Sequence, residues 1–142
     1  MRCLISWVVL TCLSVPSAEA QPSPAQRPAF LEVHIEVIQC SAYFNLLAAC
    51  MMTRPDRSGT ADVSQRLQGQ ARDFFQLGAE TGTRIGLTVD AITSRYQHER
   101  SEMMRLTRDQ PCENAASLFV RWRDMCAAYA EDPVRAMTRH LR

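Results

Sequence analysis

Residues 29–53 read AFLEVHIEVIQCSAYFNLLAACMMT, and this stretch decides the fold that we expect the chain to adopt. Apolar side chains lie almost all round a helix drawn through it, on one stripe from Phe30 to Met51 and on the faces beside that stripe. A helix that is apolar on every side is stable in water only when other elements cover it. We therefore expect it to be the central helix of an all-α domain.

Polar and apolar residues alternate between residues 32 and 37, a pattern that also fits a short strand. On a helix, Glu32 and Glu36 share a face and His34 points elsewhere, whereas on a strand all three share one face. The stretch 41–52 clearly favours helix, and we extend this prediction back to residue 29.

Four cysteines follow residue 20, an even number that is typical of a disulfide framework in an exported chain. In helices, Cys40 and Cys50 would be about 15 Å apart along the axis, and Cys112 and Cys126 about 21 Å. Bonded cysteines need Cα atoms within about 7 Å, so neither local pair can form a bridge. Both disulfides should therefore join the first helix to the last. Four thiolates on zinc are the alternative, but the usual C-x₂₋₄-C pairs are missing.

Three glycines at four-residue spacing, Gly78, Gly82 and Gly86, allow three interpretations. The chain turns there between two helices, or the glycines contact a neighbouring helix within one long helix over 61–107, or they form a groove for a ligand or partner helix. The continuous helix would be about 70 Å long, too long for the remaining helices to cover. We therefore favour the turn.

The glycine segment also selects the disulfide pairing. With a turn, the helices run up, down, up and down, and the last is antiparallel to the first. This topology predicts the nested pairs Cys40–Cys126 and Cys50–Cys112. A continuous helix would instead give Cys40–Cys112 and Cys50–Cys126.

Apolar periodicity predicts the remaining helices. Residues 54–59 form a loop by composition, and a second helix begins near residue 60. A third helix covers about 84–107, and a fourth begins near residue 111. A short basic helix runs from Asp132-Pro133 to the C-terminus. The expected architecture is an up-down bundle of about four helices with a short C-terminal helix.

Residues 1–20 have the pattern of a cleavable secretory signal peptide. Arg2 supplies a positive charge, an apolar run follows, and Ala18 and Ala20 form the small-x-small site that signal peptidase reads. The run is shorter than the roughly 20 residues that span a bilayer, which argues against an N-terminal membrane anchor. No second long apolar run follows it, so we expect no transmembrane segment after cleavage. We expect residues 21–28 to be a flexible segment and 29–142 to be the disulfide-linked helical domain.

The composition is that of a protein with balanced charge. Sixteen basic residues, all arginine, face 15 acidic residues, for a net charge of +1. This balance gives no strong bias toward nucleic acid, and we expect no nucleic-acid partner. The exclusive use of arginine is typical of a high-GC bacterium, and export then places the protein in the periplasm or outside the cell. A partner, if there is one, would be another envelope protein.

Few residues are grouped as a chemical site requires. Glu32, His34 and Glu36 are the one acid/base cluster within a short span, and they define a small hydrolase as the alternative function. The methionines, including Met51-Met52 and Met103-Met104, define a copper-binding alternative, although methionine on an apolar stripe is ordinary core filler. We expect a binding or structural role without catalytic residues, metal or cofactor.

Cys40 and Cys50 are separated by nine residues, a spacing that resembles half of the twin Cys-x₉-Cys motif of helical-hairpin proteins. This resemblance implies helices that are crosslinked by disulfides. The second pair is Cys-x₁₃-Cys, and about sixty residues intervene where that family has a short turn. The resemblance is therefore confined to residues 40–50.

Overall fold

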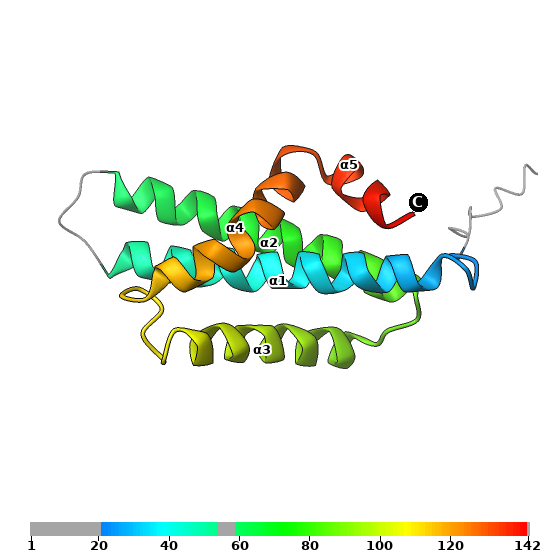
Figure 1. Ribbon diagram of the computed structural model, residues 1–142, viewed down its shortest axis with the longest axis horizontal. Coiled ribbons are helices and arrows are strands. Elements are labelled where there is room, and N and C mark those ends of the chain that lie inside the picture. Colours follow the sequence, from blue (N-terminus) through cyan, green and yellow to red (C-terminus); the bar gives the residue numbers. More distant parts are fainter. Residues whose placement is uncertain (1–20, 54–58, 142) are drawn as a thin grey trace, which may run out of the picture.

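The computed structural model describes residues 21–53 and 59–141, and every regular element within them is helical. In chain order the elements are α1 (Arg27–Met52), α2 (Thr60–Arg84), α3 (Val89–Leu106), α4 (Ala115–Glu131), α5 (Pro133–Thr138) and the 3₁₀ turn η1 (Arg139–Leu141) (Figure 1). This confirms the predicted all-α bundle with a short C-terminal helix. The predicted signal peptide, residues 1–20, lies outside the described residues, as do residues 54–58 of the predicted loop.

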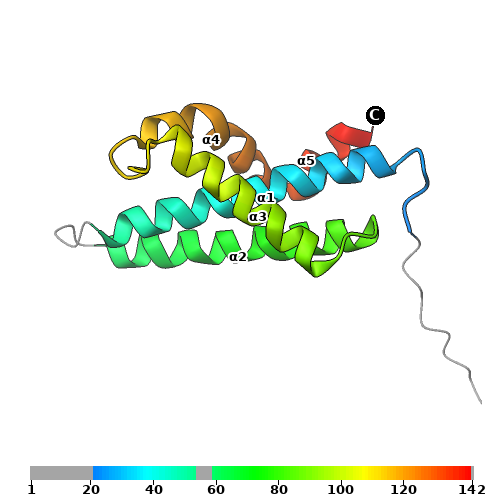
Figure 2. The same ribbon diagram turned by 90° about the horizontal axis from the view of Figure 1, so that it is seen from below.

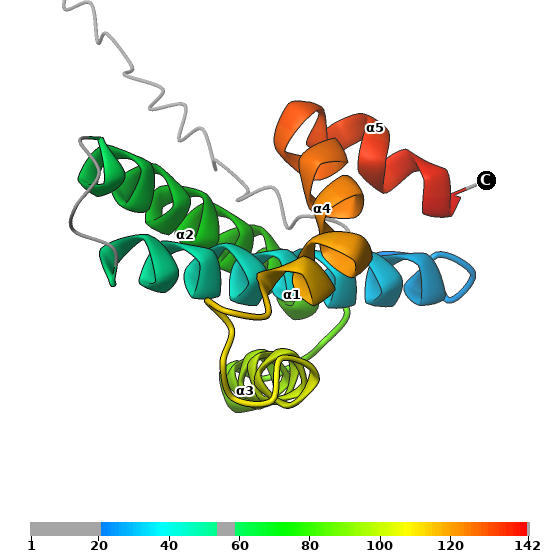
Figure 3. The ribbon, with the colours of Figure 1, turned by 60° about the vertical axis from the view of Figure 1, so that its left-hand side comes forward.

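The apolar helix α1 is central, as predicted, and contacts α2, α3, α4 and η1. α2 runs antiparallel along one side of it, while α4 and α5 lie on another side (Figure 2). α3 lies on the side of α1 opposite α4 and α5 (Figure 3). In this figure α3 is seen nearly along its own axis. By length and composition α1 could cross a membrane, but most of its apolar stretch is buried inside the fold.

α1 and α2 pack along a row of residues spaced by seven, which we call the small-residue seam. Three hydrogen bonds cross the seam, each from a side chain to a backbone carbonyl of the facing helix. They run from His34 Nδ1 to Gly78 O (2.8 Å), from Ser41 Oγ to Ala71 O (2.7 Å) and from Ser64 Oγ to Ala48 O (3.0 Å). Seven residues forward along α1 correspond to seven back along α2, as antiparallel helices in register require.

Two of the spaced glycines lie at this seam, Gly78 within the row and Gly82 one turn further along α2. A Cβ atom on Gly78 would lie 2.6 Å from Ile38 Cδ1, and one on Gly82 would lie 3.0 Å from the ring of His34. A Cβ on Gly78 would therefore require the side chain of Ile38 to shift, and one on Gly82 would require the ring of His34 to move by a few tenths of an ångström. Gly78 and Gly82 therefore pack closely against α1, but within a helix that ends at Arg84 and not within the continuous helix over 61–107 that this interpretation assumed.

Gly86 makes the predicted turn. Its φ of +86° is in the left-handed region that glycine adopts without strain. The N–H of Leu87 donates to the carbonyl of Gly82, and that of Gly86 to Thr83, in the Schellman arrangement that ends a helix. The predicted start of the third helix at 84 is therefore wrong. α3 begins at Val89.

Both disulfides have the predicted nested pairing, Cys40–Cys126 and Cys50–Cys112, with Cα–Cα distances of 5.3 and 5.1 Å. They connect α1 to α4 and to the turn just before it, because Cys112 precedes the first residue of α4, Ala115. The two crosslinks fix α4 antiparallel to α1.

The turn between α3 and α4 is longer than predicted, so the fourth helix does not begin near residue 111. Arg108 and Asp109 take φ values of +53° and +58°, which turn the chain away from the axis of α3. The side-chain amide of Asn114 then donates to the carbonyl of Thr107 (2.9 Å). This bond closes the turn ahead of α4.

Aromatic rings fill the space between α1, α2 and α4. Phe44 stacks on Phe74 with ring centroids 5.6 Å apart, and Phe74 meets Tyr129 edge to face at 6.5 Å. Tyr129 is almost completely buried, and these contacts fix its ring. Its hydroxyl consequently points at the face of α1 that carries Glu36, with an oxygen–oxygen distance of 2.8 Å.

We predict that replacing either cysteine pair by alanine lowers the free energy of unfolding by about 4–5 kcal/mol, because each disulfide closes a long loop in the unfolded chain. The loops span 86 residues for Cys40–Cys126 and 62 for Cys50–Cys112, so their entropic terms are similar. Urea unfolding of the two double variants measures this. Peptide mapping of the oxidised protein is the control for topology, and a fragment linking Cys40 to Cys112 would contradict it.

We predict opposite effects for alanine at two glycines of α2. Gly78→Ala should lower the free energy of unfolding by about 1–3 kcal/mol, because the new Cβ displaces Ile38. Gly69→Ala is the matched control, since a Cβ there meets nothing within 4 Å, and it should raise stability by about 1 kcal/mol through helix propensity. Thermal unfolding compares the two, and equal effects would show that the seam is not tightly packed.

Candidate functional site

The structure separates the three residues of the predicted acid/base cluster. Glu32 and Glu36 lie on one face of α1 and bond to residues near the C-terminus, whereas His34 points at α2. This is the helical arrangement that the sequence favoured. Glu32, His34 and Glu36 therefore do not converge on one substrate.

His34 is a structural residue of the small-residue seam. Only 1% of its surface is exposed, and its Nδ1 must carry the proton because the carbonyl of Gly78 only accepts. Its Nε2 is the one buried side-chain nitrogen or oxygen of the described residues without a hydrogen-bond partner. Burial lowers the pKa of His34; the bond to Gly78 opposes this effect and the charge of Arg95 adds to it. The imidazole is consequently neutral at ordinary pH.

A different histidine joins the two glutamates. His140 lies between them, with Nδ1 2.9 Å from Glu32 Oε2 and Nε2 2.9 Å from Glu36 Oε2. The same oxygen of Glu36 accepts hydrogen bonds from the Tyr129 hydroxyl and from Arg139, each at 2.8 Å. We call Glu32, Glu36, Tyr129, Arg139 and His140 the tail cluster. The name refers to Arg139 and His140, which belong to the C-terminal turn η1 and contact the two glutamates of α1.

The tail cluster is a network of charged and polar groups in which three of the four contacts to the glutamates meet on Glu36 Oε2. Both nitrogens of His140 face carboxylates, and its Nε2 also lies 3.3 Å from the Nε of Arg139. Burial raises the pKa of Glu36, but hydrogen bonds from Tyr129, Arg139 and His140 lower it by more, and it ends below its ordinary value. Burial, and then the bond to Glu36, raise the pKa of Tyr129. The network therefore holds Glu36 as a carboxylate.

These bonds also limit what the tail cluster can do chemically. A general base needs a lone pair that reaches the substrate. The imidazole nitrogens are both directed at carboxylates, and Glu36 Oε2 receives three donors. The geometry is that of an interaction that holds the C-terminal segment against α1.

The methionines of the copper alternative have several different surroundings. Met103 is completely buried in the hydrophobic core. Met104, Met125 and Met137 are partly buried and pack against this core from three different helices. Met52 is exposed at the end of α1. Among the described residues no group of three or more histidine, cysteine or acidic side chains is placed to hold a metal ion.

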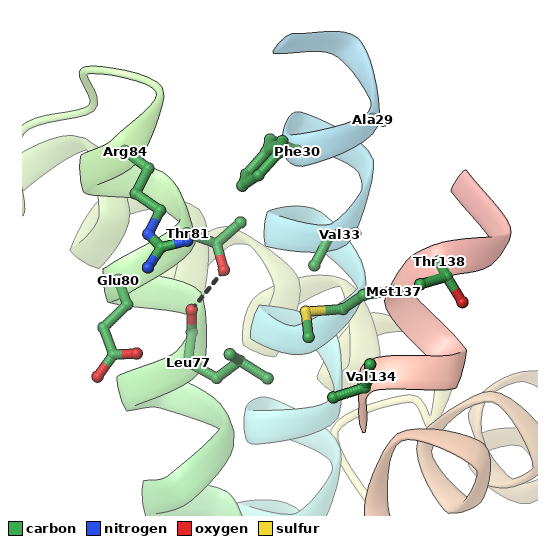
Figure 4. Close-up of a pocket in the computed structure, with 10 residues that line it drawn as sticks. All are labelled: Ala29, Phe30, Val33, Leu77, Glu80, Thr81, Arg84, Val134, Met137 and Thr138. Carbon is green, nitrogen blue, oxygen red and sulfur yellow. Dashed lines mark hydrogen bonds between the residues drawn. The ribbon is translucent and has the colours of Figure 1, made fainter. Parts of the chain in front are cut away.

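An apolar groove lies between the N-terminal half of α1, the C-terminal half of α2 and α5 (Figure 4). Its cavity volume is about 350 Å³, within the size range of small-molecule sites. The side chains that line it are mainly apolar. They are Ala29, Phe30, Val33, Leu77, Val134 and Met137, with Glu80, Thr81, Arg84 and Thr138 beside them.

The tail cluster holds one wall of this apolar groove in place. α5 begins after Asp132, whose carboxylate accepts from the backbone N–H of Arg135 (2.9 Å). Ala136 is buried against the core, while Val134 and Met137 face the groove. The bonds of η1 to α1 follow directly after α5, so they keep that wall against the rest of the fold.

No family model, curated protein or solved structure matches this chain. The site must therefore be judged from its own geometry. Neither the apolar groove nor the tail cluster follows from the sequence pattern alone. One signal for the cluster was present, since Glu32 and Glu36 share a helix face, but His140 lies more than a hundred residues later.

We predict that Glu36→Gln lowers the free energy of unfolding by about 1–2 kcal/mol near pH 7, because the charged acceptor of three hydrogen bonds is lost. Since folding lowers the pKa of Glu36, its stabilisation is complete above the ordinary value of 4.5 and is lost as the pH falls through the lower folded value. The difference between wild type and variant should therefore shrink as the pH falls below 4.5 and through the folded pKa of Glu36. Urea unfolding across this pH range measures it.

Glu32→Gln is the matched control for that experiment. The side chain of Glu32 is 65% exposed and makes a single bond to His140, so we expect a change within about 0.5 kcal/mol. A Glu36→Gln effect that stays constant with pH would contradict the assignment of the charge.

Proposed function

We propose that this chain is an exported, non-catalytic binding protein of the bacterial cell envelope, and that the apolar groove holds a small ligand. The groove itself is the observation that carries the proposal, because apolar side chains from three helices line a cavity at the surface. Natural ligand sites combine such a lining with a few polar groups. The leader pattern in residues 1–20 and the two disulfides support a periplasmic or secreted location.

A binding role also agrees with how the polar groups are used. The carboxylates and the imidazole of the tail cluster bond to one another and do not line the groove. The crosslinked core provides a rigid base, and α5 provides a wall that ends in the tail cluster. This arrangement favours recognition of a ligand over its chemical conversion.

We predict that N-phenyl-1-naphthylamine, an uncharged apolar fluorophore, binds the oxidised protein with increased emission. Val134→Glu should weaken this binding by about tenfold or more, because a charge would then face the apolar groove. Val134 is 64% exposed at the first turn of α5, where an acidic residue is compatible with the helix.

The matched control is Val120→Glu on α4. Val120 is 91% exposed and does not line the groove, so its replacement should leave fluorophore binding unchanged. Circular dichroism checks that both variants are folded. No binding to the wild type, or equal losses in the two variants, would overturn the proposal.

A further inference from the structure

The two disulfides differ in their exposure to solvent. Cys40 and Cys126 are completely buried, and both belong to the hydrophobic core. Cys50 is also buried, but Cys112 is partly exposed. Cys112 lies in the turn before α4, and its Sγ is 4.0 Å from Oγ1 of Thr53, an exposed residue directly after α1. The Cys50–Cys112 disulfide therefore reaches the surface of the protein on the Cys112 side.

This difference in exposure decides which disulfide can react in the folded protein. In thiol–disulfide exchange a thiolate attacks one of the two sulfurs directly, so the rate depends on access to that sulfur. Cys112 lies at the surface, outside the helices. Cys40 and Cys126 can be reached only after the core opens, and such opening costs much of the free energy of unfolding. The fold thus presents one disulfide to solvent and protects the other.

The turn before α4 is attached covalently to α1 through the exposed disulfide. The backbone hydrogen bonds of this turn are local. The N–H of Asp109 donates to the carbonyl of Met104 (2.8 Å), and that of Asn114 donates to the carbonyl of Gln110 (3.0 Å). Neither bond reaches α1. Reduction of Cys50–Cys112 would therefore release the turn from the end of α1, while Cys40–Cys126 continues to hold α4.

We propose that Cys112 Sγ is a site of thiol–disulfide exchange, at which a dithiol of the Cys-x-x-Cys class reduces the Cys50–Cys112 disulfide in the folded protein and opens the turn between α3 and α4. The difference in exposure between the two disulfides and the local hydrogen bonds of the turn carry this proposal. It goes beyond the binding role, because Cys50 is near the C-terminal end of α1, whereas the apolar groove lies along the N-terminal half.

The exchange transfers two electrons and two protons from the dithiol to the protein. A thiolate of the dithiol attacks Cys112 Sγ, the bond to Cys50 Sγ breaks, and Cys50 leaves as a thiolate that takes up a proton. The second thiolate of the dithiol then attacks the dithiol's own sulfur in the mixed disulfide and releases Cys112, which takes up the second proton. The products are two cysteine thiols and a disulfide within the reductant.

Timed reduction of the oxidised protein with dithiothreitol tests the exchange site. Samples are quenched with iodoacetamide, and the disulfides that remain are mapped by mass spectrometry. Cys50–Cys112 should be reduced at least about tenfold faster than Cys40–Cys126, which is the matched control within the same molecule, because its exposed sulfur is accessible without opening of the core. In concentrated urea both disulfides are exposed, so the difference in rate should disappear.

Hydrogen exchange tests the opening of the turn. After selective reduction, the amide protons of Asp109 and Asn114 should exchange at least about tenfold faster. The double variant Cys50→Ala/Cys112→Ala should show the same exchange without reductant. The double variant Cys40→Ala/Cys126→Ala controls for the loss of stability, and its turn amides should exchange more slowly than those of the first variant.

The outcomes separate this inference from the proposed function. Equal rates of reduction in the folded protein, earlier reduction of Cys40–Cys126, or a difference that persists in urea would overturn the exchange site. Unchanged exchange of the turn amides, or loss of N-phenyl-1-naphthylamine binding on selective reduction, would contradict a local opening of the turn. Absence of fluorophore binding to the oxidised protein bears on the apolar groove alone.

Discussion

The close contact between α1 and α2 is the constraint on which the rest of this structure depends. His34 and Ser41 on α1 and Ser64 on α2 each donate to a carbonyl of the facing helix. The bonded positions recur every seven residues on each helix, which requires the two backbones to approach closely. Gly78 and Gly82 allow this approach at the end where the bulky ring of His34 must fit. The contact buries one side of an apolar helix that water would not tolerate, and leaves its other sides for α3 and α4.

The disulfides then determine where the chain ends. Because Cys40–Cys126 and Cys50–Cys112 fix α4 antiparallel to α1, the segment after α4 arrives beside the N-terminal half of α1. α5 packs there and leaves the apolar groove between itself, α1 and α2. Arg139 and His140 then hydrogen-bond to Glu36 and hold the C-terminal segment against α1. The position of the groove therefore follows from the disulfides, which place α4 and α5 relative to α1. Its α5 wall is held by the hydrogen bonds of the tail cluster.

The two central histidines show what a sequence pattern can and cannot reveal about the site. His34 lies close to two glutamates in sequence, yet the helical period turns it toward α2, where a glycine carbonyl fixes its tautomer. His140 is distant in sequence and stands between the same glutamates in space. Helix geometry predicted that Glu32 and Glu36 share a face. Which residue they meet depends on the path of α4 and α5, about which the local pattern carries no information.

The sequence by itself determined the all-α class, the central place of the first helix and the nested disulfides, because apolar periodicity and helix length restrict these features directly. It also predicted the turn at Gly86, where a positive φ requires glycine. Only the tertiary structure decided that Gly78 and Gly82 serve helix packing, that α3 begins at Val89, and that the tail forms one wall of a groove. The physical reason is that such features arise from contacts between distant segments, and these contacts exist only after the helices have packed.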